Sequence, residues 1–204
     1  WLYMENGEHN AYYTGLVKYY DTWYYVENGV LNWNYTGPTE YYGTTYYVIK
    51  GILEWDYSSL VYVDDVWHYV ENGVYSNDYT GLTKYYGTWY YVEDGVLNWD
   101  YTGLTKYYDT WYYVEDSVLN WNYTGLTQYY DTWYYVEDGV LNWNKNGLYN
   151  YYGNEWCYLT NSQIDTYYTG LVNYYGTWYY VEEGFLNWDY CSLTNYYGTY
   201  YGVV

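Results

Sequence analysis

Basic residues are scarce in this sequence. It contains five lysines and no arginine against 25 aspartates and glutamates, so the formal net charge is −20. This balance argues against nucleic acid as a partner, because phosphate binding needs a basic surface, and against an anionic membrane surface for the same reason. No apolar run approaches the ~18 residues that a membrane-spanning helix requires. We therefore expect neither nucleic-acid binding nor membrane insertion.

Cysteine and histidine are also too few for a metal or redox framework. Cys157 and Cys191 stand where other parts of the pattern have Tyr and Thr, and their spacing fits no metal signature. A disulfide between them is one interpretation, and two unpaired, half-buried thiols are the simpler one. His9 and His68 occupy different positions of the pattern and anchor neither a triad nor a metal site. We predict no metal site and no cofactor.

Tyrosine and tryptophan dominate what is present. Aromatic residues make up 30% of the chain, with 46 Tyr and 14 Trp but a single Phe, and half of the chain is hydrophobic. This is not the composition of a disordered acidic tail. Because Tyr and Trp combine a large apolar face with a polar tip, they suit surfaces that are partly buried and partly in water.

An internal repeat explains this composition. The stretch from Thr102 to Trp121 occurs in about nine imperfect copies with a period of 22 residues. Its first tryptophan and the equivalents in the other copies are Trp1, Trp23, Thr45, Trp67, Trp89, Trp111, Trp133, Trp156, Trp178 and Tyr200. One residue is inserted between 152 and 156. A fixed period of this length predicts a repeat architecture, and we expect residues 1–204 to form a single array that begins and ends in mid-repeat.

Each copy has the composition of a β-hairpin. Residues 23–26 are aromatic or β-branched, which favours a strand, and residues 30–33 are the expected return strand. Asn28-Gly29 between them is a strong signal for a type I′ turn, because that turn needs positive φ at both central residues. No window of the chain has helical periodicity. We predict an all-β fold, a β-hairpin solenoid built from about nine 22-residue repeats.

The turn fixes the strand register and so assigns the side chains to two faces. With a two-residue loop, Glu27 pairs with Val30 and Val26 pairs with Leu31. Alternation along each strand then separates two sets of side chains. The face predicted to form the core carries Tyr24, Val26, Leu31 and Trp33. The face predicted to point outward carries Trp23, Tyr25, Glu27, Val30 and Asn32.

The repeat resembles a known family. Trp-Tyr-Tyr-Val-Glu-Asn-Gly at 23–29, and Tyr-Thr-Gly-Leu at 101–104, are similar to the cell-wall-binding, or choline-binding, repeats of Gram-positive surface proteins and phage lysins. The related glucan-binding and clostridial toxin repeats are similar too. The resemblance covers the whole chain. It implies a non-catalytic, extracellular or cell-surface module that binds cell-wall glycan or choline-type ligands through aromatic pockets between hairpins.

The resemblance also implies which residues bind the ligand. In choline-binding members, the first and third residues of the Trp-Tyr-Tyr run line the pocket. The equivalents here are Trp23, Tyr25, Trp67, Tyr69, Trp89, Tyr91, Trp111, Tyr113, Trp133, Tyr135, Trp178 and Tyr180. The family pattern has Thr-Gly-Trp, whose Trp supplies a third wall, whereas this chain has Leu82, Leu104, Leu126 and, in one copy, Pro38. A cell-wall glycan therefore fits at least as well as choline.

Two functions stay open on the sequence. One is a platform for cell-wall polysaccharide or teichoic acid, since aromatic faces stack on sugars and attract quaternary ammonium groups. The other is a structural filament or stalk that self-associates head-to-tail or laterally. A catalytic site needs a unique constellation of residues, and near-identical copies argue against one. We predict that the chain has no catalytic residue and is not an enzyme.

Acidic residues of the turns form a further ladder. Its members are Glu71, Glu93, Glu115, Glu137, Asp94, Asp116 and Asp138. The ladder either binds Ca²⁺, which takes several oxygen ligands, or forms a solvated row that keeps an aromatic-rich protein soluble. We favour the solvated row.

Overall fold

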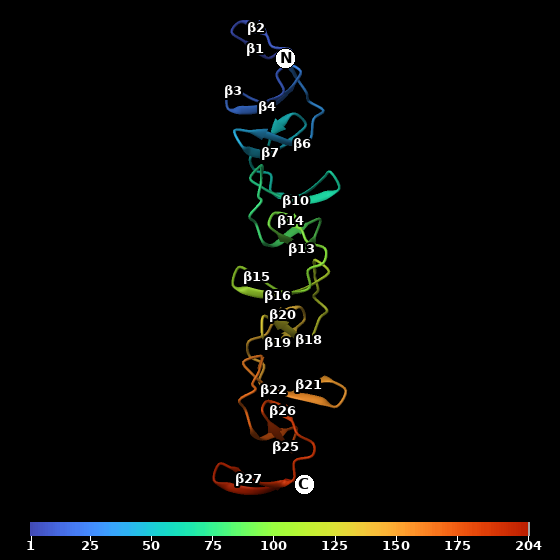
Figure 1. Ribbon diagram of the computed structural model, residues 1–204, viewed down its shortest axis with the longest axis vertical. Helices are drawn as coiled ribbons and strands as arrows, with labels where there is room; N and C mark the ends of the chain where they lie inside the picture. The colour runs from blue at the N-terminus through green and yellow to red at the C-terminus, as the bar shows by residue number, and fades with distance from the viewer. Residues whose placement is uncertain (204) are drawn as a thin grey trace. The chain divides into compact units, whose positions relative to one another are not determined.

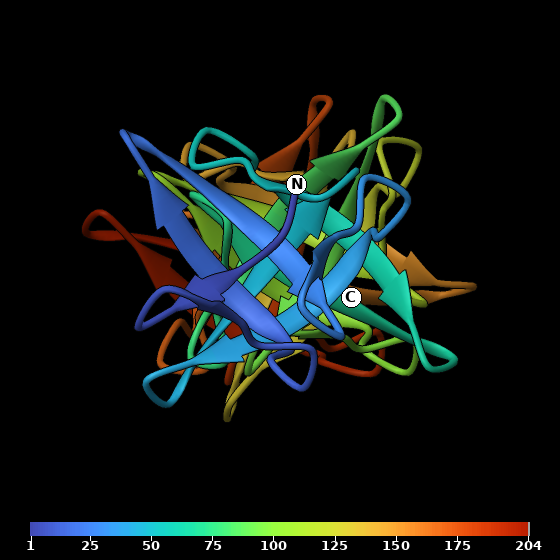
Figure 2. The same ribbon diagram turned by 90° about the horizontal axis from the view of Figure 1, so that it is seen from above.

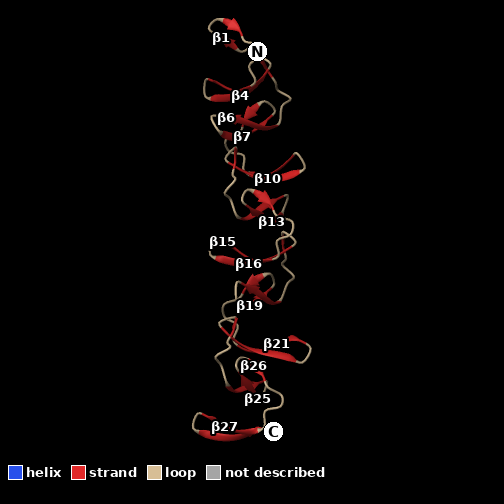
Figure 3. Ribbon diagram, viewed as in Figure 1, coloured by secondary structure: helices blue, strands red, loops and turns tan. Residues whose placement is uncertain are grey.

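The chain folds into β-hairpins. The computed structural model describes residues 1–203, and these contain 28 strands and no helix, hence no helix long and apolar enough to span a bilayer (Figures 1 and 3). The chain divides into two compact units, Trp1–Asp100 and Tyr101–Val204. The all-β prediction is confirmed. The same repeat runs through both units, and their assignment to a single array stays a prediction.

Most copies contribute two strands of five or six residues and a third of two residues. The strands of unit 1 are β1 (Met4–Glu5), β2 (Glu8–His9), β3 (Gly15–Tyr19), β4 (Thr22–Glu27), β5 (Val30–Leu31), β6 (Gly37–Tyr41), β7 (Thr44–Ile49), β8 (Ile52–Leu53), β9 (Ser59–Val63), β10 (Val66–Glu71), β11 (Val74–Tyr75), β12 (Gly81–Tyr85), β13 (Thr88–Glu93) and β14 (Val96–Leu97). The strands of unit 2 are β15 (Gly103–Tyr107), β16 (Thr110–Glu115), β17 (Val118–Leu119), β18 (Gly125–Tyr129), β19 (Thr132–Glu137), β20 (Val140–Leu141), β21 (Gly147–Tyr152), β22 (Glu155–Thr160), β23 (Gln163–Ile164), β24 (Gly170–Tyr174), β25 (Thr177–Glu182), β26 (Phe185–Leu186), β27 (Ser192–Tyr196) and β28 (Thr199–Val203).

The predicted hairpin register is correct for the two pairs that form, but the return strand ends at Leu31 and does not reach residue 33 as predicted. β4 pairs antiparallel with β5 through Val26–Leu31 and Glu27–Val30. The two loop residues, 28 and 29, have φ values of 49° and 73°, as a type I′ turn requires. The other edge of β4 pairs antiparallel with β3 over its whole length.

Within each unit, backbone hydrogen bonds join successive hairpins. In unit 2, Tyr113 N donates to Gly139 O at 2.9 Å, and Gly139 N donates to Tyr123 O at 2.8 Å. Asp138 N donates to Thr124 Oγ1 at 3.0 Å, which gives the Tyr-Thr-Gly sequence between copies a structural role. Successive hairpins of unit 1 cross one another and point their turns in different directions (Figure 2). Within each unit the hairpins stack in chain order, which is the predicted β-hairpin solenoid.

The core lies between successive hairpins, and the predicted division into a core face and an outward face is wrong. Tyr113 is 7% exposed and Val114 is 0% exposed, although they point to opposite sides of β16. Both faces of a hairpin inside the stack are covered, because it has a neighbour on either side. Exposure therefore changes along β16, from the half-buried Trp111 near its start to the buried Val114 near its end.

The correction holds in the other copies. Every tyrosine predicted to point outward is buried, with 3–9% exposed, namely Tyr25, Tyr69, Tyr91, Tyr113, Tyr135 and Tyr180. The tryptophans at the position predicted for the core are 45–53% exposed, namely Trp33, Trp99, Trp121 and Trp143. Alternation along a strand predicts exposure only where one face of a sheet is covered.

The inserted residue produces a β-bulge. The register between β21 and β22 shifts between Asn150 and Tyr152, next to the predicted interval of 152–156. The following hairpin, β24 with β25, has a regular register again. The copy that contains the bulge also carries Lys145 where other copies have a tyrosine.

Gly139 lies where two successive hairpins approach closely, so a substitution at this position tests that contact. Its φ is +73°, and a Cβ placed there would lie 2.5 Å from Asn120 O and 2.9 Å from Trp121 Cα. We expect Gly139→Ala to lower the free energy of unfolding by about 1–3 kcal/mol, because backbone atoms must shift and an L side chain is strained at this φ. Urea unfolding followed by circular dichroism measures the change. Gly176 has a φ of +89° with nothing within 4 Å of the added Cβ. An equal loss for Gly176→Ala would contradict the steric explanation.

The two cysteines are unpaired, in agreement with the simpler interpretation, but neither is half-buried. Cys157 is buried and Cys191 is exposed. Burial raises the pKa of the Cys157 thiol to about 12, so this thiol is protonated and unreactive near neutral pH.

Thiol titration tests this difference. We expect Ellman's reagent at about pH 8 to modify Cys191 rapidly in the folded chain and to reach Cys157 only after unfolding in urea, because the thiolate is the nucleophile. The Cys191→Ser variant is the control and should show no rapid reaction. Rapid modification of that variant would contradict the burial of Cys157.

Candidate functional site

Four aromatic rings from two successive hairpins come together in unit 2. Trp111 lies on β16, Tyr129 ends β18, Tyr134 lies on β19, and Trp143 follows β20. The rings of Trp111 and Tyr129 meet edge-to-face with centroids 4.8 Å apart, and those of Tyr134 and Trp143 meet edge-to-face at 5.9 Å. Trp111, Tyr129 and Tyr134 pack against one shared core cluster. We call such a set of four residues an aromatic box and name it after its first tryptophan.

The box recurs in both units. Unit 1 contains the Trp1 box (Trp1, Tyr19, Tyr24, Trp33), the Trp23 box (Trp23, Tyr41, Tyr46, Trp55) and the Trp67 box (Trp67, Tyr85, Tyr90, Trp99). Unit 2 contains the Trp111 box and the Trp156 box (Trp156, Tyr174, Tyr179, Trp188). In all five, the first tryptophan meets its tyrosine at 4.8–5.3 Å and the second tryptophan meets the other tyrosine at 5.7–6.2 Å.

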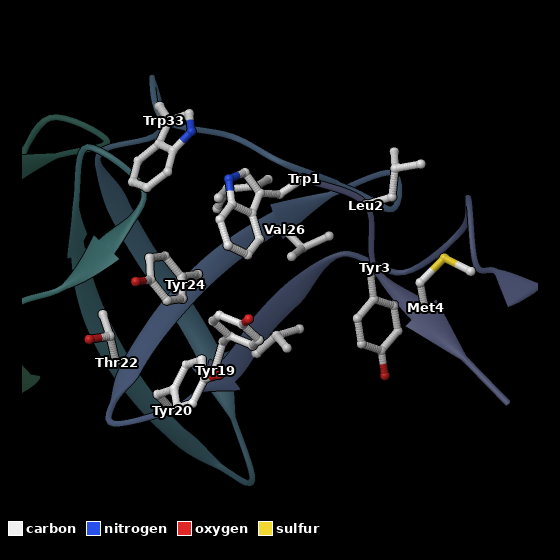
Figure 4. Close-up of a pocket in the computed structure, with 12 residues that line it drawn as sticks. Trp1, Leu2, Tyr3, Met4, Tyr19, Tyr20, Thr22, Tyr24, Val26 and Trp33 are labelled. Carbon is white, nitrogen blue, oxygen red and sulfur yellow. The ribbon is translucent and has the colours of Figure 1, made fainter. Parts of the chain in front are cut away.

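The boxes enclose different amounts of space. The four rings of the Trp1 box line a cavity of about 460 Å³, and Figure 4 shows them gathered around it. In the Trp156 box the four rings, together with Leu148 and Leu186, leave about 20 Å³. That space holds about one water molecule. Trp188 is 60% exposed, and its indole Nε1 donates a hydrogen bond of 3.1 Å to Asn154 O, which holds the ring in place.

A buried layer supports the boxes. Tyr113 stacks on Tyr123 with centroids 3.7 Å apart and an interplanar angle of 18°. Tyr123 OH donates to Leu126 O at 2.6 Å, and burial raises the pKa of Tyr123 to about 12. Leu104 occupies the Thr-Gly-Leu position, is 2% exposed and belongs to the same cluster as Tyr113. This leucine therefore fills the core beneath the box and does not form one of its walls.

Three tyrosines of the boxes have a raised pKa and are uncharged near neutral pH. Burial raises the pKa of Tyr41, Tyr85 and Tyr129 above the ordinary value for tyrosine. A protonated phenol and an indole both present the negative face of a quadrupole, which attracts cations without a fixed charge. The arrangement is suited to an organic cation with little hydrogen-bonding capacity.

The structure brings together only part of the predicted ligand-binding set. Of the predicted tryptophans, Trp23, Trp67 and Trp111 each form a wall of a box. The ring centroids of Trp178 and Tyr196 lie 4.9 Å apart. Lys84 Nζ lies 5.8 Å from the ring centroid of Trp89. The predicted tyrosines lie in the buried layer, and Tyr25, Tyr69, Tyr91, Tyr113, Tyr135 and Tyr180 are all core residues.

The predicted ligand-binding set omits the residues that the second hairpin contributes to each box. In the Trp111 box they are Tyr129, Tyr134 and Trp143. Their equivalents recur with the same 22-residue period as the predicted set, and this periodicity was the available signal. Trp143 belongs to the position that was assigned to the core, and its 45% exposure shows that this assignment was wrong.

Within each unit, one position of the repeat differs clearly from the complete boxes described above. One period after the Trp23 box, unit 1 has Thr45, Val63, His68 and Asn77. In unit 2, Trp133 has no ring contact within residues 101–203, and Thr166 stands where the second tryptophan would be. Trp133 is 44% exposed, much like the tryptophans of complete boxes, so it is a natural internal control.

Amide side chains hold the carboxylates of the turns. Asn120 Nδ2 donates to Glu115 Oε2 at 2.7 Å, and Asn142 Nδ2 donates to Glu137 Oε2 at 2.7 Å. Among residues 1–203, no group of three or more His, Cys, Asp or Glu side chains is placed to hold a metal ion. These hydrogen bonds give the acidic ladder a structural role at the turns.

Known proteins share this repeat. A family profile described as Choline-binding repeat matches residues 12–32, 56–74, 78–98, 100–120, 122–142 and 167–187, more than half of the chain. No curated protein sequence matches significantly. Among solved structures, the chain is similar to CbpJ from Streptococcus pneumoniae TIGR4, with 25% identity and a TM-score of 0.35 over 81% of this chain and 56% of that chain.

Two further solved structures are similar. Choline binding protein F from Streptococcus pneumoniae has 22% identity and a TM-score of 0.33 over 86% of this chain and 57% of that chain. The modular autolysin LytC from Streptococcus pneumoniae has 16% identity and a TM-score of 0.29 over 97% of this chain and 48% of that chain. The chain thus spans about half the length of these proteins.

Proposed function

The chain belongs to the choline-binding repeat family, and from this premise we propose that it is a non-catalytic module that binds choline groups of a cell-wall polymer such as teichoic acid. The observation that carries the proposal is the aromatic box, with two tryptophans and two tyrosines from successive hairpins. The proposed location is the cell surface, where such a polymer is accessible.

Cation–π attraction is the proposed source of affinity. A trimethylammonium group has no N–H to donate, so polar side chains offer it little, whereas ring faces attract its diffuse charge. Such contacts contribute about 0.5–1 kcal/mol at exposed sites and about 2 kcal/mol where water is excluded. The net charge of −20 raises the local concentration of cations around the chain.

Entry into a box requires different movements in different copies. The Trp1 box has a cavity of about 460 Å³ and accepts a ligand as it stands. The Trp156 box leaves about 20 Å³, so one of its rings must move to admit a ligand, and an outward movement of Trp188 breaks its hydrogen bond to Asn154 O. The cost of that movement lowers affinity, and we therefore expect the boxes to bind choline with unequal strength.

Several boxes on one chain suit a polymeric ligand. Once one choline group is bound, the next groups of the same polymer are held at a high effective concentration near the other boxes. Weak individual sites therefore combine into firm attachment to a wall, although free choline at high concentration still releases the chain.

Retention on a choline-bearing wall, followed by competitive elution, tests this proposal. We expect the chain to be retained, to be released by free choline, and to resist release by 3,3-dimethylbutan-1-ol, the neutral isostere of choline. Elution by both compounds alike would contradict cation–π recognition. Equal retention on walls stripped of choline would instead identify a glycan as the ligand, and the proposal for choline would fail.

Self-association is a second proposal, supported by exposed rings at the hairpin tips. Tyr20, Tyr42, Tyr86, Tyr108, Tyr130, Tyr175 and Tyr197 are 81–92% exposed. Exposed aromatic rings at regular intervals offer contacts to a second copy of the chain. Light scattering after size exclusion at micromolar concentration measures the assembly. A single monomeric peak across the concentration range would contradict a filament.

A further inference from the structure

A groove in unit 2 coincides with the most irregular copy of the repeat. Lys145-Asn146 replaces the Tyr-Thr pair of regular copies such as Tyr123-Thr124, and the bulge between Asn150 and Tyr152 lies in the same hairpin. A cavity of about 490 Å³ opens there, lined by Lys145, Asn146, Leu148, Tyr149, Asn150, Asn173, Tyr174 and Tyr175. Its lining differs from that of the boxes, because it contains a cation and three amides.

Lys145 has no carboxylate partner in the described part of the chain. Its ammonium lies 4.7 Å from the centroid of the Tyr135 ring, and the side chain is half-buried. Burial distinguishes Lys145 from the other four lysines, which are all exposed. An ammonium group held in a concave surface without a counter-ion is prepared to receive an anion.

Three amides line the groove together with Lys145. Asn146 Nδ2 donates to Asn144 O and Asn150 Nδ2 donates to Gly153 O, so these two donors are already used. Asn173 Oδ1 accepts a hydrogen bond of 3.1 Å from Gly176 N, which leaves its Nδ2 group to donate to a ligand. Tyr149 and Tyr174 line the same cavity. Lysine, amide and phenol donors together suit an anion with several oxygens, because a tetrahedral phosphate accepts hydrogen bonds from several directions.

The groove adjoins the Trp156 box. Leu148 and Tyr174 line both the groove and the small cavity of that box. A cation held by the box and an anion held in the groove would therefore share a wall formed by Leu148 and Tyr174. Among the described boxes, the other with a resolved cavity, the Trp1 box, has no lysine in its lining.

We propose that the Lys145 groove binds a phosphate group of the polymer whose choline occupies the Trp156 box. The identity of the polymer rests on the function proposed above, whereas the phosphate site rests on the groove alone. The groove gives this copy a preference for a ligand that carries both charges. The regular copies, which have a tyrosine at the Lys145 position, recognise the ammonium group only.

Lysine-selective isotope labelling tests the groove directly, since the chain has five lysines and gives five side-chain signals. We expect inorganic phosphate and phosphocholine to shift the Lys145 Cε signal in a saturable manner, with the other four unmoved. Sodium chloride at equal ionic strength should leave all five in place. The proposal would be overturned if the Lys145 signal did not shift, or if all five lysine signals shifted equally with ligand concentration and without saturation.

A matched pair of variants completes the test. Lys145→Gln should weaken phosphocholine binding at this site about ten-fold, since it removes a charged hydrogen-bond donor, and should leave choline binding unchanged. Lys50→Gln makes the same charge change at an exposed turn of unit 1 and should alter neither ligand. Equal effects of the two variants would overturn the assignment. If phosphate binds at Lys145 but choline moves no box tryptophan, the groove stands and the proposed choline function falls.

Discussion

Replacement of Tyr113 by alanine is expected to destabilise unit 2 by about 3–5 kcal/mol, the loss typical of a buried aromatic ring cut back to a methyl group. The ring of Tyr113 is 7% exposed and stacks on Tyr123 at a centroid distance of 3.7 Å. It also belongs to one cluster with Val136 and Leu141 of the next hairpin. The substitution therefore leaves a cavity at the joint between two hairpins, where the surrounding side chains have little freedom to close it.

Urea unfolding and hydrogen exchange measure this loss. Exchange at the amides of Val114 and Val136 should accelerate together, since they lie on the two hairpins that the Tyr113 ring joins. Tyr113→Phe keeps the stacked ring and should cost far less. Trp143→Ala should also cost less than Tyr113→Ala, because the Trp143 side chain is 45% exposed and buries less of its surface. A larger loss for Trp143→Ala than for Tyr113→Ala would contradict the placement of Tyr113 in the core and of Trp143 at its exposed margin.

Removal of both tryptophans of one box should abolish one ligand site without unfolding the chain. We expect the Trp111→Ala, Trp143→Ala variant to bind choline at the Trp111 box about 100-fold more weakly, because each indole contributes about 0.5–2 kcal/mol to the binding of a cation. Both side chains lie at the outer part of the stack, and Trp143 is 45% exposed. The buried layer beneath them stays intact.

Calorimetric titration with choline measures this effect as a fall in the number of sites by one. The control is Trp133→Ala, which removes an indole of similar exposure that has no ring partner within residues 101–203. It should leave the number of sites unchanged. A loss of one site in the control, or no loss in the double variant, would contradict the assignment of the box.

The hairpin and its register could be predicted because they are local. Asn28-Gly29 requires positive φ at two successive residues, which selects one turn type and so fixes the pairs Val26–Leu31 and Glu27–Val30. The turn between β3 and β4 carries no such signal in the sequence. Tyr20 adopts a φ of 51°, where Asn, Asp or Gly is the usual residue. Its ring lies edge-on to Tyr19 at 4.6 Å, a contact that offsets part of the backbone cost.

The site could be predicted only in part because it joins two hairpins. The period identified Trp111 as a candidate, but alternation along one strand could not show that the face of Tyr113 packs against the next hairpin. Trp143 was assigned to the core for the same reason. Sequence patterns within one copy predict how its strands pair. The rings that meet across two copies depend on the angle at which successive hairpins cross, and no pattern within one copy predicts that angle.

Choline titration followed at the indole N–H signals of the 14 tryptophans tests the central claim most directly, because each box tryptophan reports on its own site. We expect saturable shifts for the tryptophans of complete boxes, including Trp111, Trp143, Trp156 and Trp188, and no shift for Trp133. A shift of Trp133 as large as those of the box tryptophans, or binding to choline-bearing walls with no indole signal moved, would contradict recognition by the aromatic boxes.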